Sequence, residues 1–216
     1  MIYSVAIDGP SASGKSTIAK LLAKKLSITY IDTGAMYRAV AYYFIENSVN
    51  DFSDTNIEKV MKGFKLKYDN QKVFVNDILI KDDFLRTSEV TNLVSKVSAS
   101  KYVRKYLVDF QRKLSVCESV VMDGRDIGTN VLPNATYKFY MIASAKERAR
   151  RRLADFENKG DKKSYEAVLA EIKDRDFKDA NRELNPLVKA NDAIEIDTSH
   201  LKIDDVLKII IERIEI

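Results

Sequence analysis

The sequence predicts an α/β fold in which helices cover a parallel sheet. Five short apolar segments are typical of buried strands, at residues 2–7, 28–31, 120–122, 137–142 and 193–196. The first strands lead through short turns into helix-like segments, and strand–turn–helix units in succession favour a parallel sheet. One stretch, residues 64–80, instead alternates short strands with turns and predicts a small antiparallel insert.

Length and composition favour one domain with a substantial core, because 45% of the 216 residues are hydrophobic. The net charge of +4 is a modest surplus, smaller than a nucleic-acid-binding protein would carry. The single cysteine, Cys117, excludes an internal disulfide and fits a reducing compartment, and its simplest interpretation is a small apolar residue beside a strand. No apolar run approaches the ~20 residues of a membrane span, and the N-terminus lacks the features of a signal peptide. We expect a cytoplasmic monomer that binds neither nucleic acid nor membrane.

A glycine-rich loop separates the first strand from the first helix. Within residues 9–17, Gly9, Gly14, Lys15 and Ser16 match the spacing G-x-x-x-x-G-K-[ST]. The loop follows a strand that ends at Asp8 and precedes a helical stripe that begins at Ile18. Glycine lets consecutive amides turn toward an anion, and the helix N-terminus adds unpaired N–H groups. A glycine-bearing turn before a capped helix is the alternative, but the strand–loop–helix context favours a phosphate-binding loop, which we call the phosphate loop.

The side chains of the phosphate loop predict a triphosphate and a metal ion. Lys15 supplies a mobile cation for the outer phosphates, and the Ser16 hydroxyl can ligate Mg²⁺, which prefers oxygen ligands. We therefore expect Mg²⁺ to arrive with the nucleotide. The expected triphosphate contacts comprise the whole loop: Gly9, Pro10, Ser11, Ala12, Ser13, Gly14, Lys15, Ser16 and Thr17.

A second strand–helix junction carries an arginine. Asp32-Thr33-Gly34 turns the second strand into a helix expected over residues 35–45, with Arg38 one turn into it. Ligands collect at the carboxyl ends of parallel strands, so Arg38 fits a ligand-facing role, although its spacing fits a solvated arginine equally well. Beyond it we expect a helix at residues 57–61, strands at residues 64–68, 72–75 and 76–80, and helices at residues 86–97 and 101–116.

The third strand of the parallel sheet ends in a charged, glycine-flanked loop. Asp123 follows the strand, and Arg125 and Asp126 come next. A carboxylate at this position in a phosphate-loop protein commonly orients Mg²⁺ or its waters. Either aspartate alone is equally well explained as a helix cap or turn residue. That both would be caps around an arginine is the weaker explanation.

Two arginine-bearing helices follow the fourth strand. Arg148, Arg151 and Arg152 fall at i, i+3 and i+4, which puts them on one helix face. A polyanionic ligand explains this clustering of like charge, and a solvated basic face with acidic neighbours is the alternative. In the second helix, expected over residues 164–181, Arg175 and Asp179 share a face with Arg182.

The break expected between these helices, at residues 156–163, contains a tetrad typical of GTP-binding proteins. Residues 158–161 match the base-recognition pattern N-K-x-D. In those proteins the tetrad follows a sheet strand, whereas here it follows a helix, so we interpret it as a turn. A last helix is expected at residues 206–214.

Taken together, these motifs resemble the bacterial cytidylate kinases of the nucleoside monophosphate kinase group, over nearly the whole chain. The motifs that carry the resemblance are residues 7–11 with Gly14-Lys15, residues 32–38, residues 86–90, residues 123–128, and Arg175-Asp176 with Asp179 and Asn181-Arg182. They are far more specific in combination than the phosphate loop alone.

The resemblance implies a three-layer P-loop NTPase fold with a five-stranded parallel sheet. It implies a core at residues 1–50, 86–147 and 183–216, a nucleotide-monophosphate-binding insert at residues 51–85 and an arginine-rich lid at residues 148–182. The implied reaction transfers the γ-phosphoryl of ATP, bound with Mg²⁺, to CMP or dCMP, which yields CDP or dCDP. The expected partners are therefore the small nucleotides ATP, CMP and dCMP.

The resemblance also implies roles for individual residues. The implied acceptor-binding residues are Thr33, Tyr37, Arg38, Ser95, Arg104, Arg125, Asp126, Arg175, Asp179 and Arg182. The implied catalytic residues are Lys15, Arg125, Asp126, Arg148, Arg151 and Arg152, with Ser16 and Asp123 at the metal.

The residues by themselves leave alternative functions open. Within the kinases, a UMP or shikimate-type acceptor is the nearest alternative. A GTP-binding switch would need an Asp-x-x-Gly motif near Asp123, and none occurs there. A nucleic-acid-binding ATPase would interleave aromatic residues with its basic helices, which this chain does not.

Overall fold

The computed structural model describes residues 2–158, 160 and 162–214. Its contacts divide the chain into two compact units, which are described separately. The first unit comprises Met1–Tyr30 and Glu118–Ile216, and the second comprises Ile31–Cys117. The division into core, insert and lid expected from the sequence stays a prediction.

The sheet of the first unit has the order β2-β6-β1-β7-β8. Its strands are β1 (Ser4–Asp8), β2 (Thr29–Asp32), β6 (Val120–Gly124), β7 (Tyr137–Ile142) and β8 (Ile194–Asp197). The last two residues of β2, Ile31 and Asp32, belong to the second unit. The central strand β1 pairs in parallel with β6 and with β7, and β7 pairs in parallel with β8. Asp8 lies opposite Gly124 in this register, so the carboxyl ends of β1 and β6 meet at one edge. The predicted parallel α/β fold is confirmed.

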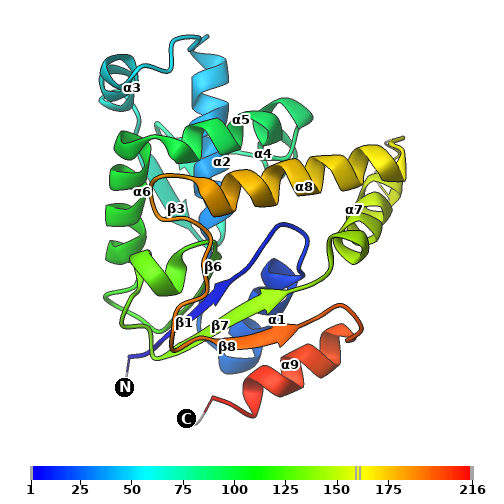
Figure 1. The fold of residues 1–216 in the computed structure, drawn as a ribbon. Helices are drawn as coiled ribbons and strands as arrows, with labels where there is room; N and C mark the ends of the chain where they lie inside the picture. The colour runs from blue at the N-terminus through cyan, green and yellow to red at the C-terminus, as the bar shows by residue number, and fades with distance from the viewer. Residues whose placement is uncertain (1, 159, 161, 215–216) are drawn as a thin grey trace. The chain divides into compact units, whose positions relative to one another are not determined.

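Helices α1 (Lys15–Leu26) and α9 (Ile203–Ile211) pack against this sheet and against each other. Ile18 and Leu22 of α1, and Val206 and Ile210 of α9, repeat at i and i+4 and form one buried cluster with strand residues. Figure 1 shows α1 and α9 beside strands β1, β7 and β8. This core fixes the start of α1, and with it the end of the phosphate loop.

Helices α7 (Ala145–Asn158) and α8 (Tyr165–Asn181) form a pair with a small core of their own. Ala149 of α7 packs with Val168 and Ile172 of α8. The break expected from residue 156 starts later, because α7 continues through Asn158. The interpretation of residues 158–161 as a turn falls partly outside the described residues, since Lys159 and Asp161 are not among them.

The second unit combines helices with a three-stranded antiparallel sheet of order β3-β4-β5. Its elements are α2 (Thr33–Glu46), α3 (Asp54–Met61), β3 (Leu66–Asp69), β4 (Lys72–Val75), β5 (Ile78–Ile80), α4 (Asp82–Leu85), α5 (Ser88–Ala99) and α6 (Lys101–Leu114). Both hairpins turn through two residues with positive φ, Asn70-Gln71 and Asn76-Asp77. These angles are those of the type I′ turn that matches strand twist. The antiparallel insert expected from the sequence is present.

Several details differ from the sequence prediction. The short helix α4 and a π-helical turn, η1 (Ile127–Val131), have no counterpart in it. Both are too short to show an apolar period. Cys117 is exposed and free, so it is not an apolar contact beside a strand.

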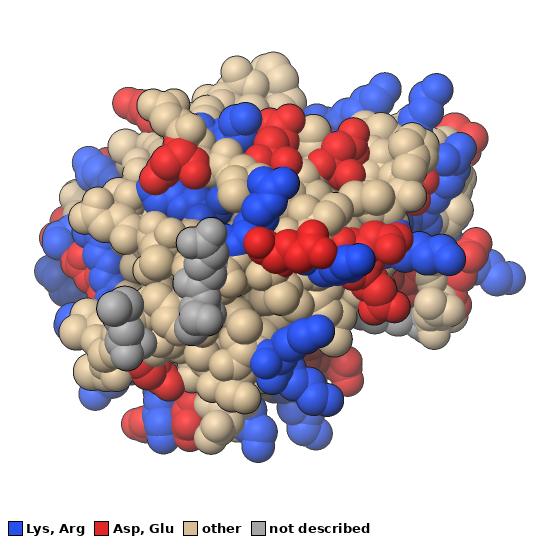
Figure 2. All heavy atoms as spheres, turned by 90° about the horizontal axis from the view of Figure 1, so that it is seen from below, with Lys and Arg blue, Asp and Glu red and all other residues tan. Residues whose placement is uncertain are grey.

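Surface charge is mixed on the face drawn in Figure 2, where basic and acidic side chains are interspersed over the described residues. The described residues also form exposed ion pairs, for example Lys105 with Asp109 and Lys178 with Asp174. No described helix has both the length and the apolar character needed to cross a membrane.

Candidate active site

The phosphate loop has a backbone that its glycines make possible. Gly9 and Gly14 have φ of 152° and 90°, and a Cβ on Gly9 would overlap the carbonyl oxygen of Met141. Ala12 also has a positive φ, of 59°. Helix α1 begins directly at Lys15, and its N-cap, Gly14, contributes no side-chain hydrogen bond. The first amides of α1 therefore stay available for an anion.

Two buried side chains inside the phosphate loop suit a phosphate. Lys15 donates from Nζ to the carbonyl oxygen of Pro10 at 3.1 Å. Burial lowers the pKa of Lys15 to about 7, and the positive charge of Arg125 contributes to this shift. The hydroxyl of Ser13 is fully buried and has no hydrogen-bond partner among the described residues. A bound phosphate would supply an acceptor to Ser13 and a counter-charge to Lys15.

The two residues expected at the metal lie in contact. Ser16 Oγ donates to Asp123 Oδ2 at 2.6 Å, and Tyr30 Oη donates to Asp123 Oδ1 at 2.8 Å. A hydroxyl and a carboxylate offer the oxygen ligands that Mg²⁺ prefers. Across residues 2–158, 160 and 162–214, no group of three or more His, Cys, Asp or Glu side chains could hold a metal by itself. The donor set therefore fits an ion that takes its remaining ligands from water and a nucleotide.

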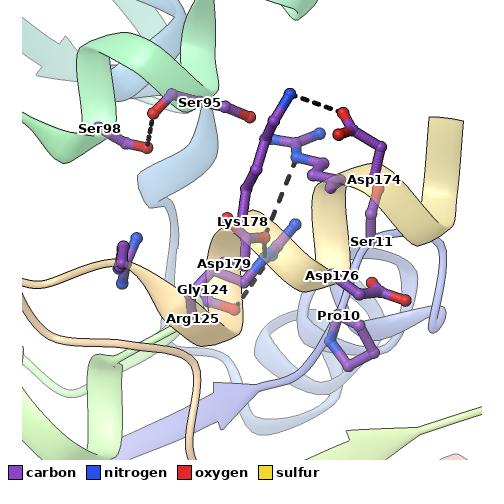
Figure 3. Close-up of polar contacts among 12 residues, drawn as sticks. Pro10, Ser11, Ser95, Ser98, Gly124, Arg125, Asp174, Asp176, Lys178 and Asp179 are labelled. Carbon is purple, nitrogen blue, oxygen red and sulfur yellow. Dashed lines mark hydrogen bonds and ion pairs between the residues drawn. The ribbon is translucent and has the colours of Figure 1, made fainter.

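Arg125 is held by a carboxylate of α8, as Figure 3 shows. Its Nε donates to Asp179 Oδ2 at 2.8 Å, and Arg175 Nε lies 4.0 Å from the same oxygen. Burial acts to raise the pKa of Asp179, but the charges of Arg125 and Arg175 outweigh it and hold that pKa below its usual value. Burial likewise opposes the charge of Arg125, yet Asp179 keeps the pKa of Arg125 raised. The guanidinium stays charged and is fixed in direction.

Asp126 pairs with Arg182. Arg182 Nη2 donates to Asp126 Oδ1 at 2.9 Å, and its Nε donates to the carbonyl oxygen of Asn185 at 2.6 Å. Asn130 donates to the other carboxylate oxygen of Asp126 at 3.0 Å. Helix α8 ends at Asn181, so Arg182 lies just beyond the helix and reaches a different aspartate from Arg125. The first unit thus brings together two arginine–aspartate pairs.

Helix α7 carries four arginines, and the three expected at the site make different contacts. Arg148 donates to both carboxylate oxygens of Asp176, at 2.9 and 2.6 Å, and to the carbonyl oxygen of Ser11 at 3.2 Å. Arg151 donates to the hydroxyl of Thr198 at 3.1 Å. The guanidinium of Arg152 lies 4.9 Å from the ring centroid of Phe156.

Thr198 connects Arg151 to the phosphate loop. Thr198 is buried, and its hydroxyl donates a hydrogen bond to the carbonyl oxygen of Ser13 at 3.0 Å. Arg148 and Arg151 are therefore both linked to backbone carbonyls of the phosphate loop, one directly and one through Thr198. The sequence offers no signal for Thr198 or Tyr30, because both act through hydrogen bonds to segments far away in the chain.

In the second unit, Asp32 organises the start of α2. One carboxylate oxygen caps the helix by accepting from the Ala35 amide at 2.8 Å, and the other accepts from Arg38 Nη2 at 3.1 Å. Arg86 Nη2 lies 3.8 Å from that second oxygen. Thr33, the first residue of α2, is buried. The Asp32 carboxylate therefore holds Arg38 and Arg86 near the N-terminus of α2.

Another group in the second unit joins α2, α5 and α6. The guanidinium of Arg104 lies 5.8 Å from the ring centroid of Tyr37, and its Nη1 donates to the carbonyl oxygen of Ser98 at 3.4 Å. The Ser95 carbonyl accepts from the Ser98 hydroxyl at 3.1 Å. Arg104 is almost fully buried, which is unusual for a charged residue at a helix surface.

The predicted acceptor residues fall into two sets, one in each unit. The second unit contains Thr33, Tyr37, Arg38, Ser95 and Arg104, and the first unit contains Arg125, Asp126, Arg175, Asp179 and Arg182. The contacts described above join Arg104 to Tyr37 in the second unit, and they pair Arg125 with Asp179 and Arg182 with Asp126 in the first.

Comparison with known proteins decides the family. The family model described as cytidylate kinase matches residues 5–216. This chain belongs to the cytidylate kinase family.

Individual relatives agree with that assignment. The chain is 48% identical over 211 residues to a cytidylate kinase of Fusobacterium nucleatum, which covers 98% of this chain and 96% of the relative. It is 47% identical over 212 residues to a cytidylate kinase of Carboxydothermus hydrogenoformans, with 96% and 95% covered.

A solved structure supports the fold. An uncharacterized protein from Eubacterium ventriosum is similar with a TM-score of 0.52, over 98% of this chain and 97% of that one. Its sequence identity is only 16%, so this likeness concerns the fold alone.

Proposed function

We propose that this chain transfers the γ-phosphoryl group of ATP to CMP or dCMP and produces ADP with CDP or dCDP. One observation carries the proposal: the phosphate loop contacts the end of β6 through the hydrogen bond from Ser16 to Asp123. The two residues that follow β6 are each paired, Arg125 with Asp179 of α8 and Asp126 with Arg182 just beyond α8. The relatives named cytidylate kinase support the choice of acceptor.

In the proposed mechanism, the amides of the phosphate loop and Lys15 bind the phosphates of the donor. Ser16 and Asp123 would hold Mg²⁺ directly or through its waters. When bound, this ion neutralises charge on the phosphates and orients them. The site residues contribute position and charge, which is most of what phosphoryl transfer requires from a protein.

The proposed contacts of the acceptor are those that the family resemblance implies. Arg38 and Arg125 bind its phosphate, and Thr33, Ser95, Arg104 and Asp126 contact the cytidine. An oxygen of the acceptor phosphate attacks the γ-phosphorus of ATP, and the bond to the bridging oxygen of ADP breaks. Arg125 offsets the negative charge that gathers during transfer. Arg148, Arg151 and Arg152 close over the site and exclude water, which limits ATP hydrolysis.

The proposal includes a monomeric protein that acts in the cytoplasm. The single cysteine, which leaves no internal disulfide, and the use of ATP as donor support this location. Size-exclusion chromatography with light scattering measures the oligomeric state, and a stable dimer would contradict the monomer.

The proposed reaction is tested by product analysis. Purified protein is incubated with ATP, MgCl₂ and CMP, and nucleotides are separated by ion-exchange chromatography. Equal amounts of ADP and CDP are expected, and chelation of Mg²⁺ should stop both. Lys15→Ala should lower the rate by about a hundredfold or more, because it removes a charge aimed at the phosphates. ADP without CDP would identify an ATPase and contradict the proposal.

A further inference from the structure

Asp8, the last residue of β1, holds a turn of the chain that lies more than a hundred residues away in the sequence. Its Oδ1 accepts from the Ile127 amide at 2.8 Å, and its Oδ2 accepts from the Gly128 amide at 2.7 Å. The side chain is buried, with 5% of the residue exposed. Hydrogen bonds that backbone amides donate to a buried ionised carboxylate are among the stronger ones in proteins.

Arg125 and Asp126 lie between two attachments to this one residue. On the N-terminal side, Gly124 is the parallel-sheet partner of Asp8. On the C-terminal side, the amides of Ile127 and Gly128 bind the Asp8 carboxylate. Only two residues span the interval, so their backbone has little freedom to rotate.

The other side of the turn is closed by Lys138. A Cβ on Gly128 would lie 3.1 Å from Lys138 Cδ and 3.4 Å from Asp8 Oδ2. Lys138 is itself fixed by Asp192, with Nζ 2.7 Å from Oδ2, and by the carbonyl oxygen of Pro133 at 2.6 Å. Gly128 is thus the residue that lets the turn approach Asp8 closely.

We propose that Asp8 is a positioning residue for the acceptor site, which fixes the backbone of Arg125 and Asp126 through the Ile127 and Gly128 amides. The inference rests on the proposed function for the roles of Arg125 and Asp126. Both carboxylate oxygens of Asp8 are engaged by these amides. Its effect is therefore expected on the acceptor monophosphate and on turnover rather than on ATP.

Asp8→Asn is the first test. Asparagine keeps the volume and one acceptor oxygen but turns an NH₂ group toward one of the two amides, which loses its partner. Assayed at about pH 8, two units above the Asp8 pKa of about 6, the wild-type carboxylate is ionised. The expected result is a KM for CMP raised about tenfold or more, a reduced kcat, and a KM for ATP within about twofold of wild type.

Gly128→Ala is an independent variant that loosens the same contact without altering β1. Its added methyl group presses on Lys138 and Asp8, so the KM for CMP should rise here too. The control is Asp192→Asn, which weakens the hold on Lys138 but leaves both Asp8 hydrogen bonds in place. It should keep both KM values near those of wild type.

A readout that does not depend on the reaction is amide hydrogen exchange at Ile127 and Gly128. Asp8→Asn should raise the exchange rate of at least one of these two amides by about tenfold or more relative to amides of β1, because that amide loses its hydrogen bond. Unchanged exchange, or a KM for ATP that rises as much as the KM for CMP, would overturn the inference. If wild-type protein made no CDP at all, the proposed function would fail instead, and the exchange result would still decide whether Asp8 holds the turn.

Discussion

Lys15 has a positive charge in a buried position, and this sets its acid–base behaviour. Burial and the nearby Arg125 lower its pKa from 10.5 to about 7. In the unfolded chain the ordinary pKa applies, so between about pH 7 and 10.5 the unfolded state binds the extra proton. The contribution of Lys15 to stability therefore rises with pH through that window. A bound phosphate reverses the shift, because it favours the charged amine.

Proton uptake on ATP binding follows from this shift. Above pH 7 the Lys15 amine of the nucleotide-free protein is partly neutral. The phosphates of bound ATP raise its pKa, so binding takes up a proton. Isothermal titration calorimetry at about pH 8, in buffers of different ionisation enthalpy, measures the number of protons. Uptake of up to about one proton per ATP is expected, and it should fall at about pH 6. Equal uptake in Lys15→Met would assign the proton to another group.

Arg125 is expected to contribute mainly to turnover. Removal of one electrostatic group of this kind commonly costs about 3 to 4 kcal/mol, so Arg125→Ala should lower kcat by on the order of a hundredfold or more. Steady-state kinetics with CMP measures the effect. Arg150→Ala is the matched control, since Arg150 is exposed on α7 and pairs with Glu147 of the same helix. Turnover within about threefold of wild type would remove Arg125 from the mechanism.

At the scale of elements, the α7–α8 pair combines a small apolar core with an ion pair between buried Arg148 and partly exposed Asp176. Arg148 binds both carboxylate oxygens of Asp176, and its side chain is 6% exposed. Breaking a buried pair by removing one partner leaves the other charge without compensation. Because Arg148 also binds the Ser11 carbonyl, loss of Asp176 should destabilise both the α7–α8 pair and the phosphate loop.

Asp176→Ala is expected to lower the free energy of unfolding by about 3 kcal/mol. Asp174→Ala is the control from the same helix, because its partner Lys178 is exposed and such surface pairs contribute about 0 to 1 kcal/mol. Urea denaturation of both variants measures the difference. Equal decreases in the free energy of unfolding would show that the Arg148–Asp176 pair stabilises the protein no more than an exposed pair does.

The hairpins of the antiparallel sheet offer a further test at this scale. Gln71 has a φ of 62°, a conformation that costs residues with a Cβ roughly 1 kcal/mol. Gln71→Gly should relieve part of this strain and stabilise the protein by about 0.5 kcal/mol. A loss of thermal stability in Gln71→Gly, measured by calorimetry, would contradict the type I′ assignment of this turn.

The elements themselves are well predicted where a period or turn residues mark them. The strand over residues 137–142 matches β7, and the turns around Asn70 and Asn76 separate the strands as expected. The π-helical turn η1 escapes prediction because its shape follows from the hydrogen bonds to Asp8 across the sheet. Helix α7 extends past the expected break because charge alone does not end a helix.

At the scale of the whole molecule, the sequence correctly predicts the parallel sheet, the antiparallel insert and the family. The spatial strand order β2-β6-β1-β7-β8 is what brings Asp123 to Ser16, and no local pattern contains that order. Residues with a motif, such as Lys15 and Arg125, could be named from the chain alone. Their supports, such as Tyr30, Asp8 and Thr198, became visible only through long-range contacts.

The acceptor preference is the central claim and can be measured directly. Initial rates of ADP formation from ATP and Mg²⁺ are compared for CMP, dCMP, UMP and AMP, with kcat/KM as the measure. CMP and dCMP should exceed UMP and AMP by about tenfold or more, because a site built to hydrogen-bond one base rejects others strongly. A clear preference for UMP or AMP over both cytidine nucleotides would contradict the account.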